Sequence, residues 1–145
     1  MQSSKMDSRR EAVSRDISHW RDNENFLQWI VTINHISYEQ AKELTAERFL
    51  GGWCEDFALY FAVRFGVPML FLNQEHSIVN IAGLFFDAAD CAGVERLSDM
   101  KYVRESPKLS RLSEEQLEKL LEVDEEWRKY KPLASRVGMI EKYEH

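Results

Sequence analysis

The fold of this chain is decided by residues 51–87, GGWCEDFALYFAVRFGVPMLFLNQEHSIVNIAGLFFD. After two glycines, an apolar segment with helical spacing runs from Cys54 to Phe65. Gly66 and Pro68 then form a normal signature for the C-terminus of a helix. Because apolar residues surround much of this helix, we expect it to be the central, buried helix of the protein.

Three β-strands are predicted after this helix. Residues 67–72 form a continuous apolar run, which is typical of a strand covered on both faces. Residues 76–81 and 84–87 flank the dipeptide Ala82-Gly83, a short link with a glycine where a positive φ is needed. The pattern therefore predicts a β-hairpin.

The register of this hairpin brings a histidine and an aspartate together. With a two-residue loop, Ile81 faces Leu84, and Ile78 then faces Asp87. His76 projects from the same face of the sheet as Asp87 and is its diagonal neighbour, within side-chain reach. An aspartate that accepts a hydrogen bond from one imidazole nitrogen sets the tautomer of the ring and favours the imidazolium.

Cys54 stands at the start of the central helix, where unpaired amides and the helix dipole favour a thiolate. A free thiol is mostly protonated at neutral pH, so a nucleophilic cysteine needs such help. Glu55 and Asp56 oppose a thiolate beside them, which makes a cationic partner necessary. Cys54, His76 and Asp87 have the types and the chain order of a nucleophile, its base and an orienting carboxylate.

These residues carry a resemblance to a known superfamily. Gly-Gly-Trp-Cys-Glu-Asp-Phe-Ala at 51–58, followed by His-Ser-Ile-Val-Asn-Ile-Ala-Gly-Leu-Phe-Phe-Asp-Ala at 76–88, resembles the Cys…His…Asp core of papain-like and transglutaminase-like cysteine enzymes. The resemblance covers residues 51–89 and is strongest to the small bacterial and phage members. It implies a hydrolase or acyl transferase, whether peptidase, deamidase or transglutaminase-like, that acts on an amide bond of a protein or peptide. It also implies the three roles just described.

The sequence departs from the larger papain-like peptidases at two points. His76 follows Cys54 by only 22 positions, which fits a reduced core. A glutamine is also missing from the place just upstream of the cysteine where those peptidases carry an oxyanion donor. Trp53, Gln28 and Asn34 are the candidates for oxyanion or substrate contacts.

Helices are predicted on the N-terminal side of this core. Residues 1–8 are expected to form a loose tail. Apolar residues at helical spacing predict one helix that ends near residue 20 and another over residues 24–33. Ser37 and Gln40 form a capping box, which predicts a third helix that ends near residue 48.

A second capping box, Ser113 with Gln116, begins the C-terminal part. It predicts an acidic amphipathic helix over residues 113–130. We expect residues 1–145 to form a single α+β domain with a papain-like core, in which the cysteine helix packs on a small antiparallel sheet. Helices flank this core at both ends.

Composition narrows the function classes. The formal net charge is -6 over 145 residues, which argues against a nucleic-acid partner bound by phosphate neutralisation. Apolar runs stay far below membrane-spanning length, and the polar N-terminus does not resemble a signal peptide. We therefore expect a cytoplasmic protein with reduced thiols, a protein or peptide substrate, and no membrane association or cofactor.

Simpler roles remain open for the same residues. Cys54 also fits a buried structural thiol, His76 a sheet histidine, and Asp87 the cap of the turn after Phe86. A zinc site made of Cys54, His76 and Asp87 has suitable ligand types but lacks a clear fourth ligand, so no metal is expected. The alternative to an enzyme is a non-catalytic acidic interaction protein on the same fold, which inhibits a host factor or a defence system.

Overall fold

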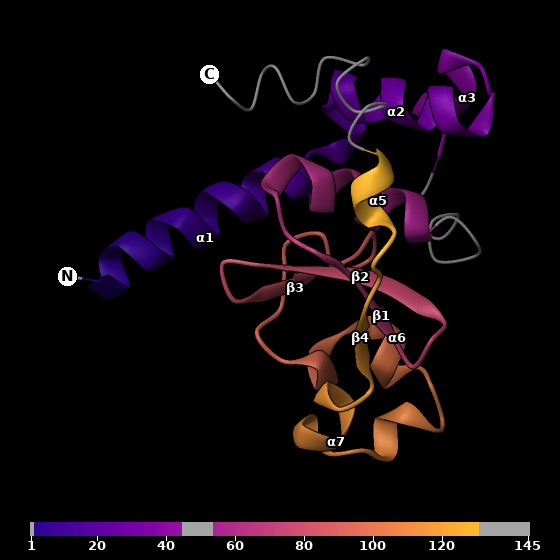
Figure 1. The fold of residues 1–145 in the computed structure, drawn as a ribbon. Helices are drawn as coiled ribbons and strands as arrows, with labels where there is room; N and C mark the ends of the chain where they lie inside the picture. Colours follow the sequence, from indigo (N-terminus) through magenta and orange to yellow (C-terminus); the bar gives the residue numbers. More distant parts are fainter. Residues whose placement is uncertain (1, 45–53, 131–145) are drawn as a thin grey trace.

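The computed structural model describes residues 2–44 and 54–130, with side chains over 8–44 and 55–129, and the described chain is α+β. Figure 1 shows the arrangement of the elements. In chain order the elements are α1 (Gln2–Ser18), η1 (Trp20–Asp22), α2 (Glu24–Asn34), α3 (Tyr38–Lys42), α5 (Cys54–Phe65), β1 (Met69–Leu72), β2 (His76–Ile81), β3 (Leu84–Phe86), η2 (Leu97–Asp99), α6 (Lys101–Arg104), η3 (Leu109–Arg111), α7 (Glu114–Glu118), β4 (Leu121–Val123) and η4 (Trp127–Tyr130).

The strands form one antiparallel sheet in the order β3-β2-β1-β4. Ala82 and Gly83, at φ of 55° and 82°, make a two-residue loop of the kind that suits the twist of a hairpin. Ile81 lies opposite Leu84, so the predicted register of the hairpin is confirmed. The predicted strand at 67–72 is shorter, because β1 begins at Met69.

The two faces of the sheet carry separate hydrophobic clusters. The first cluster joins α1, α2 and α5 to one face, where Val79 and Ile81 point. The second cluster covers the other face and is built from Leu72, Ile78, Phe85, Leu97, Met100, Val103, Leu109 and Leu117. Figure 1 shows the sheet between these two groups of helices. The alternation of strand side chains thus divides the core into two layers.

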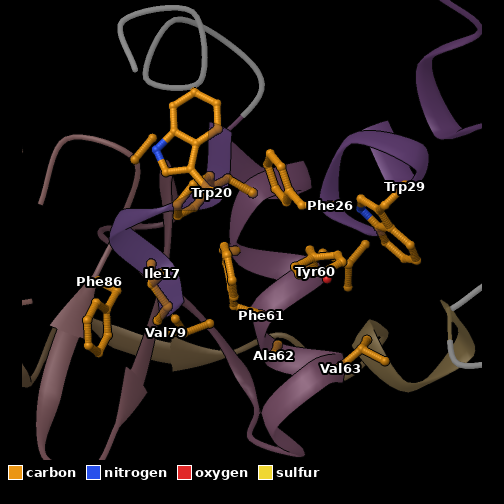
Figure 2. Packing of buried hydrophobic residues seen from close by; sticks show 14 of the residues in the cluster. Ile17, Trp20, Phe26, Trp29, Tyr60, Phe61, Ala62, Val63, Val79 and Phe86 are labelled. Carbon is orange, nitrogen blue, oxygen red and sulfur yellow. The ribbon is translucent and has the colours of Figure 1, made fainter. Parts of the chain in front are cut away.

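Helix α5 is the central helix, as predicted. Its Tyr60 and Phe61 are fully buried, and Phe26 of α2 meets the Tyr60 ring edge-on at 5.1 Å between centroids. Figure 2 shows Phe61 projecting from α5 toward Ile17 and Val79. Such aromatic pairs add to the stability that burial of their area supplies. The helix ends before Gly66, which has a φ of 68°.

The N-terminal region is more regular than predicted. Helix α1 begins at Gln2, so the loose tail expected over residues 1–8 is wrong for residues 2–8, and Met1 lies outside the described residues. Arg10 explains part of the order, because its Nε donates a hydrogen bond to the carbonyl of Ala82 at 2.8 Å. Over the ranges that the structure describes, no helix has the length and apolar character needed to cross a bilayer.

Both capping boxes are confirmed, around Ser37 and around Ser113. The first begins α3, which ends at Lys42, and the remainder of the helix predicted to reach residue 48 lies outside the described residues after position 44.

The acidic helix predicted over residues 113–130 is wrong. Within this range only α7 is an α-helix, and it is followed by the strand β4 and the 3-10 helix η4. Leu121 and Val123 pair with Leu72 and Leu70, so the free edge of β1 takes this segment as a strand. Tertiary pairing has overridden the local helical pattern.

Candidate functional site

His76 and Asp87 form a buried pair. The Nε2 atom of His76 lies 2.7 Å from Oδ2 of Asp87, and the two side chains are 1% and 2% exposed. His76 is the first residue of β2 and Asp87 directly follows β3, so the hairpin register sets their distance. The predicted proximity of these two residues is confirmed. Because a carboxylate only accepts, the shared proton belongs on Nε2 when the ring is neutral.

Tyr102 of α6 covers the imidazole. Its ring stacks on the His76 ring with 4.0 Å between centroids and 14° between planes. The phenol hydroxyl donates to Oε2 of Glu75 at 3.3 Å. His76 projects from the sheet face of the second cluster, which also carries Ile78.

Asp87 is also bonded through its other carboxylate oxygen. Oδ1 accepts the backbone N–H of Asp90 at 2.7 Å, and Oδ2 of Asp90 accepts the N–H of Lys101 at 2.9 Å. Burial raises the pKa of Asp90, and the hydrogen bond from Lys101 partly offsets this. Sequence reasoning missed Asp90 and Tyr102. The spacing Asp-x-x-Asp after β3 was a usable signal for the turn at Asp90, whereas nothing local marked Tyr102.

Cys54 is the first residue of α5, while its side chain and the whole of Trp53 lie outside the described residues. Helix α5 packs on the sheet face opposite to the one from which His76 projects. Figure 1 shows α5 beginning toward the end of the sheet where β1 stops and β2 starts, which is the end that carries the pair of Leu72 and His76. The structure thus brings His76 and Asp87 together, while the helix that Cys54 begins lies on the other face of the sheet.

The first turn of α5 is acidic. Burial raises the pKa of Glu55, and the neighbouring carboxylates of Asp124, Asp56 and Glu126 raise it further. Burial also raises the pKa of Asp56, while a hydrogen bond from the Asn34 side chain lowers it. These carboxylates oppose a thiolate at the helix start, as the sequence indicated.

The described oxyanion candidates differ in position. Asn34, the last residue of α2, reaches the first turn of α5 through Asp56, and its Nδ2 also donates to the carbonyl of Ile30 at 3.2 Å. Gln28 lies exposed on the solvent side of α2. Of the two, the structure brings only Asn34 to the helix that Cys54 begins.

The second cysteine has an ordinary structural setting. Cys91 is half-buried, its carbonyl accepts a hydrogen bond from Ser18 Oγ at 3.1 Å, and burial raises the pKa of its thiol. A higher pKa means less thiolate at neutral pH. Among the described side chains, no group of three or more His, Cys, Asp or Glu residues is placed to hold a metal ion.

Comparisons with known proteins leave the interpretation of this site to its own geometry. No protein-family model, curated protein or solved structure matches the chain.

Proposed function

We propose that the protein is a small cytoplasmic cysteine hydrolase or acyl transferase that acts on an amide bond of a protein or peptide. Cys54 is its nucleophile, His76 its base and Asp87 the orienting carboxylate. The observation that supports this proposal most is the 2.7 Å pair of His76 and Asp87, buried at the start of β2. A buried ionisable pair is a weak source of stability, so an imidazole held in this way favours a chemical role.

The hydrogen bond to Asp87 determines which imidazole nitrogen of His76 acts as the base. With its proton on Nε2, the His76 ring has its basic lone pair on Nδ1. In the proposed reaction Nδ1 takes the proton of the Cys54 thiol, and the thiolate attacks the carbonyl carbon of the substrate. The imidazolium returns the proton to the leaving amine, which leaves a thioester on Cys54. Water or a second amine then releases the acyl group.

The developing oxyanion needs donors close to the sulfur. The first amides of α5 have no partner within the helix and can supply them. The Asn34 side chain, which the Asp56 contact holds at the same turn, is the second candidate. Donors of this kind would stabilise the tetrahedral intermediate.

The charge around the helix start favours a basic substrate. Within the described parts of the chain, the carboxylates of Asp56, Asp124 and Glu126 raise the pKa of Glu55 at this turn, and Lys129 lowers it. Lys129 is already paired with Glu126 at 3.0 Å. A peptide with lysine or arginine near the scissile amide is therefore expected to bind better than an acidic one.

Thiol reactivity tests the proposal, with Cys91 as an internal reference. The protein is alkylated with iodoacetamide at neutral pH, and labelling of each cysteine is followed by peptide mass spectrometry. We expect Cys54 to react at least about tenfold faster than Cys91, because only an activated cysteine is largely thiolate at this pH. His76→Ala should remove this advantage, whereas the control His19→Ala should keep it.

A second variant distinguishes loss of the catalytic charge from loss of the fold. Asp87→Asn keeps the shape of the side chain but removes its charge, and it should slow the labelling of Cys54 in a protein that still unfolds cooperatively. Equal and slow labelling of both cysteines in the wild type would contradict the proposal and favour the acidic interaction protein. Once a reactive Cys54 is found, release of ammonia, cleavage of basic peptides and incorporation of a fluorescent amine separate deamidase, peptidase and transferase.

A further inference from the structure

We propose that Asp90 and Tyr102 are positioning residues that fix the plane of the His76 imidazole. The value of this positioning for catalysis rests on the proposed function. The orientation of the ring can be observed without measuring any activity.

A closed series of contacts carries the inference. It runs from His76 to Asp87, from Asp87 to the amide of Asp90, and from the Asp90 carboxylate to the amide of Lys101, with lengths of 2.7, 2.7 and 2.9 Å. Tyr102 follows Lys101 and stacks back on His76 at 4.0 Å. The series therefore returns to the ring from which it began.

The stack supplies a restraint that the hydrogen bond lacks. The Nε2–Oδ2 bond fixes the distance of one ring edge from Asp87. Tyr102 lies nearly parallel to the imidazole, at 14°, and opposes tilting of the ring toward that face. Because the two restraints act along different directions, both contribute to where Nδ1 of His76 points.

Two anchors hold Tyr102 in turn. Its hydroxyl donates to Glu75, the neighbour of His76 in the chain. The Asp90 carboxylate holds the first amide of α6, the short helix that carries Tyr102. A helix of only four residues gains little order from its own hydrogen bonds, so the Asp90 contact determines where α6 begins.

The buried charge of Asp90 also opposes folding, which an uncharged residue would not do. Burial raises the pKa of its carboxyl, which means that holding the charge there opposes folding. The amide oxygen of an asparagine can accept the same Lys101 N–H. The geometry thus predicts that Asp90→Asn preserves the position of the ring and that Asp90→Ala does not.

Side-chain NMR of the histidines tests the inference. The Nε2–H signal of His76 is assigned by its absence from His76→Gln, and its exchange with water is measured in the full chain. We expect Asp90→Ala and Tyr102→Leu to accelerate this exchange roughly three- to tenfold, the effect of losing one ordinary hydrogen bond or its protection. Asp90→Asn should stay close to the wild type, whereas Tyr102→Phe, which keeps the stacked ring but loses the bond to Glu75, should fall between the wild type and Tyr102→Leu.

Glu114→Ala is the matched control. Glu114 also accepts backbone N–H groups at a short helix of the same layer, those of Leu97 and Ser98 at 2.7 and 2.8 Å, but its helix η2 does not carry Tyr102. This variant should lose stability without accelerating the exchange at His76. Acceleration in Glu114→Ala equal to that in Asp90→Ala would show general loosening and would overturn the inference.

Unchanged exchange in both Asp90→Ala and Tyr102→Leu would also overturn it. If Asp90→Ala fails to fold, Tyr102→Leu and Tyr102→Phe test the same contacts from the other end. The alkylation rate of Cys54, measured on the same samples, addresses the proposed function separately. A wild-type Cys54 as slow as Cys91 would refute that function while the exchange data still decide the positioning of the ring.

Discussion

The imidazole of His76 and the carboxylate of Asp87 are paired inside the protein, 2.7 Å apart, at a point where both side chains are almost inaccessible to water. Removing either partner leaves the other buried without its counterpart. We therefore expect His76→Ala and Asp87→Ala each to lower the free energy of unfolding by about 3–5 kcal/mol in urea titrations.

The double variant of His76 and Asp87 separates the pair from other effects. His76→Ala also removes the stack with Tyr102, so the single values contain more than one contact. In a double-mutant cycle we expect a coupling of about 1–3 kcal/mol, because the second deletion no longer leaves an unpaired group. Strictly additive losses would show that the two side chains do not stabilise each other.

The hairpin loop predicts opposite effects at two adjacent positions. Ala82 has a φ of 55°, a conformation that strains a residue with a Cβ by about 1–2 kcal/mol. Ala82→Gly relieves this strain but adds flexibility to the unfolded chain, so we expect a net gain of about 0.5 kcal/mol in the free energy of unfolding. Gly83→Ala should lose about 1 kcal/mol or more, because its φ is 82° and the new Cβ would lie 2.6 Å from Nη2 of Arg10. Thermal denaturation of both variants checks the signs, and a loss in both would contradict the loop geometry.

Strand β4 can be tested with proline at neighbouring positions. The N–H of Asp124 donates to the Met69 carbonyl, so by alternation Glu122 is hydrogen-bonded to β1 and the N–H of Val123 points away from it. We expect Glu122→Pro to lower the free energy of unfolding by about 1–3 kcal/mol and Val123→Pro by less than about 1 kcal/mol.

A helix over the same residues would give a different result. Proline would then be equally damaging at Glu122 and at Val123, costing about 3 kcal/mol at each position. Chemical denaturation of the two variants therefore distinguishes the strand from the helix that the sequence pattern favoured.

Asp56 predicts a dependence of stability on pH. Its pKa is raised by burial from the ordinary value of 3.8, so the unfolded chain releases this proton at lower pH than the folded protein does. The contribution of Asp56 to stability is therefore greatest below the unfolded pKa and falls as pH rises through the folded pKa. Relative to the wild type, Asp56→Asn should gain stability as pH rises from about 3 to about 7. Urea titrations across this range check the trend, and a difference that shrinks with rising pH would contradict it.

Local chemistry explains why much of the fold was predictable. The caps at Ser37 and Ser113, the end of α5 at Gly66 and the hairpin loop all depend on a few adjacent residues. Once the loop length was known, the period of the strands fixed the register, and with it the proximity of His76 and Asp87.

Contacts between distant segments explain what was not predictable. β4 is a strand because β1 has a free edge, which the sequence around Leu121 does not reveal. Tyr102 reaches His76 only because the segment after β3 folds back over the sheet. Tail residues 2–8 are helical as part of α1, whose Arg10 contacts a hairpin more than seventy positions away.

The chain from Leu117 to Trp127 links the two layers of the core. Leu117 is buried in the second cluster and Trp127 in the first, with β4 passing along the rim of the sheet between them. This short segment therefore connects the two hydrophobic clusters directly. Cleavage of the backbone within it would break this direct connection between the two clusters, and we expect it to loosen the cluster that covers the His76 imidazole without altering any side chain of the site.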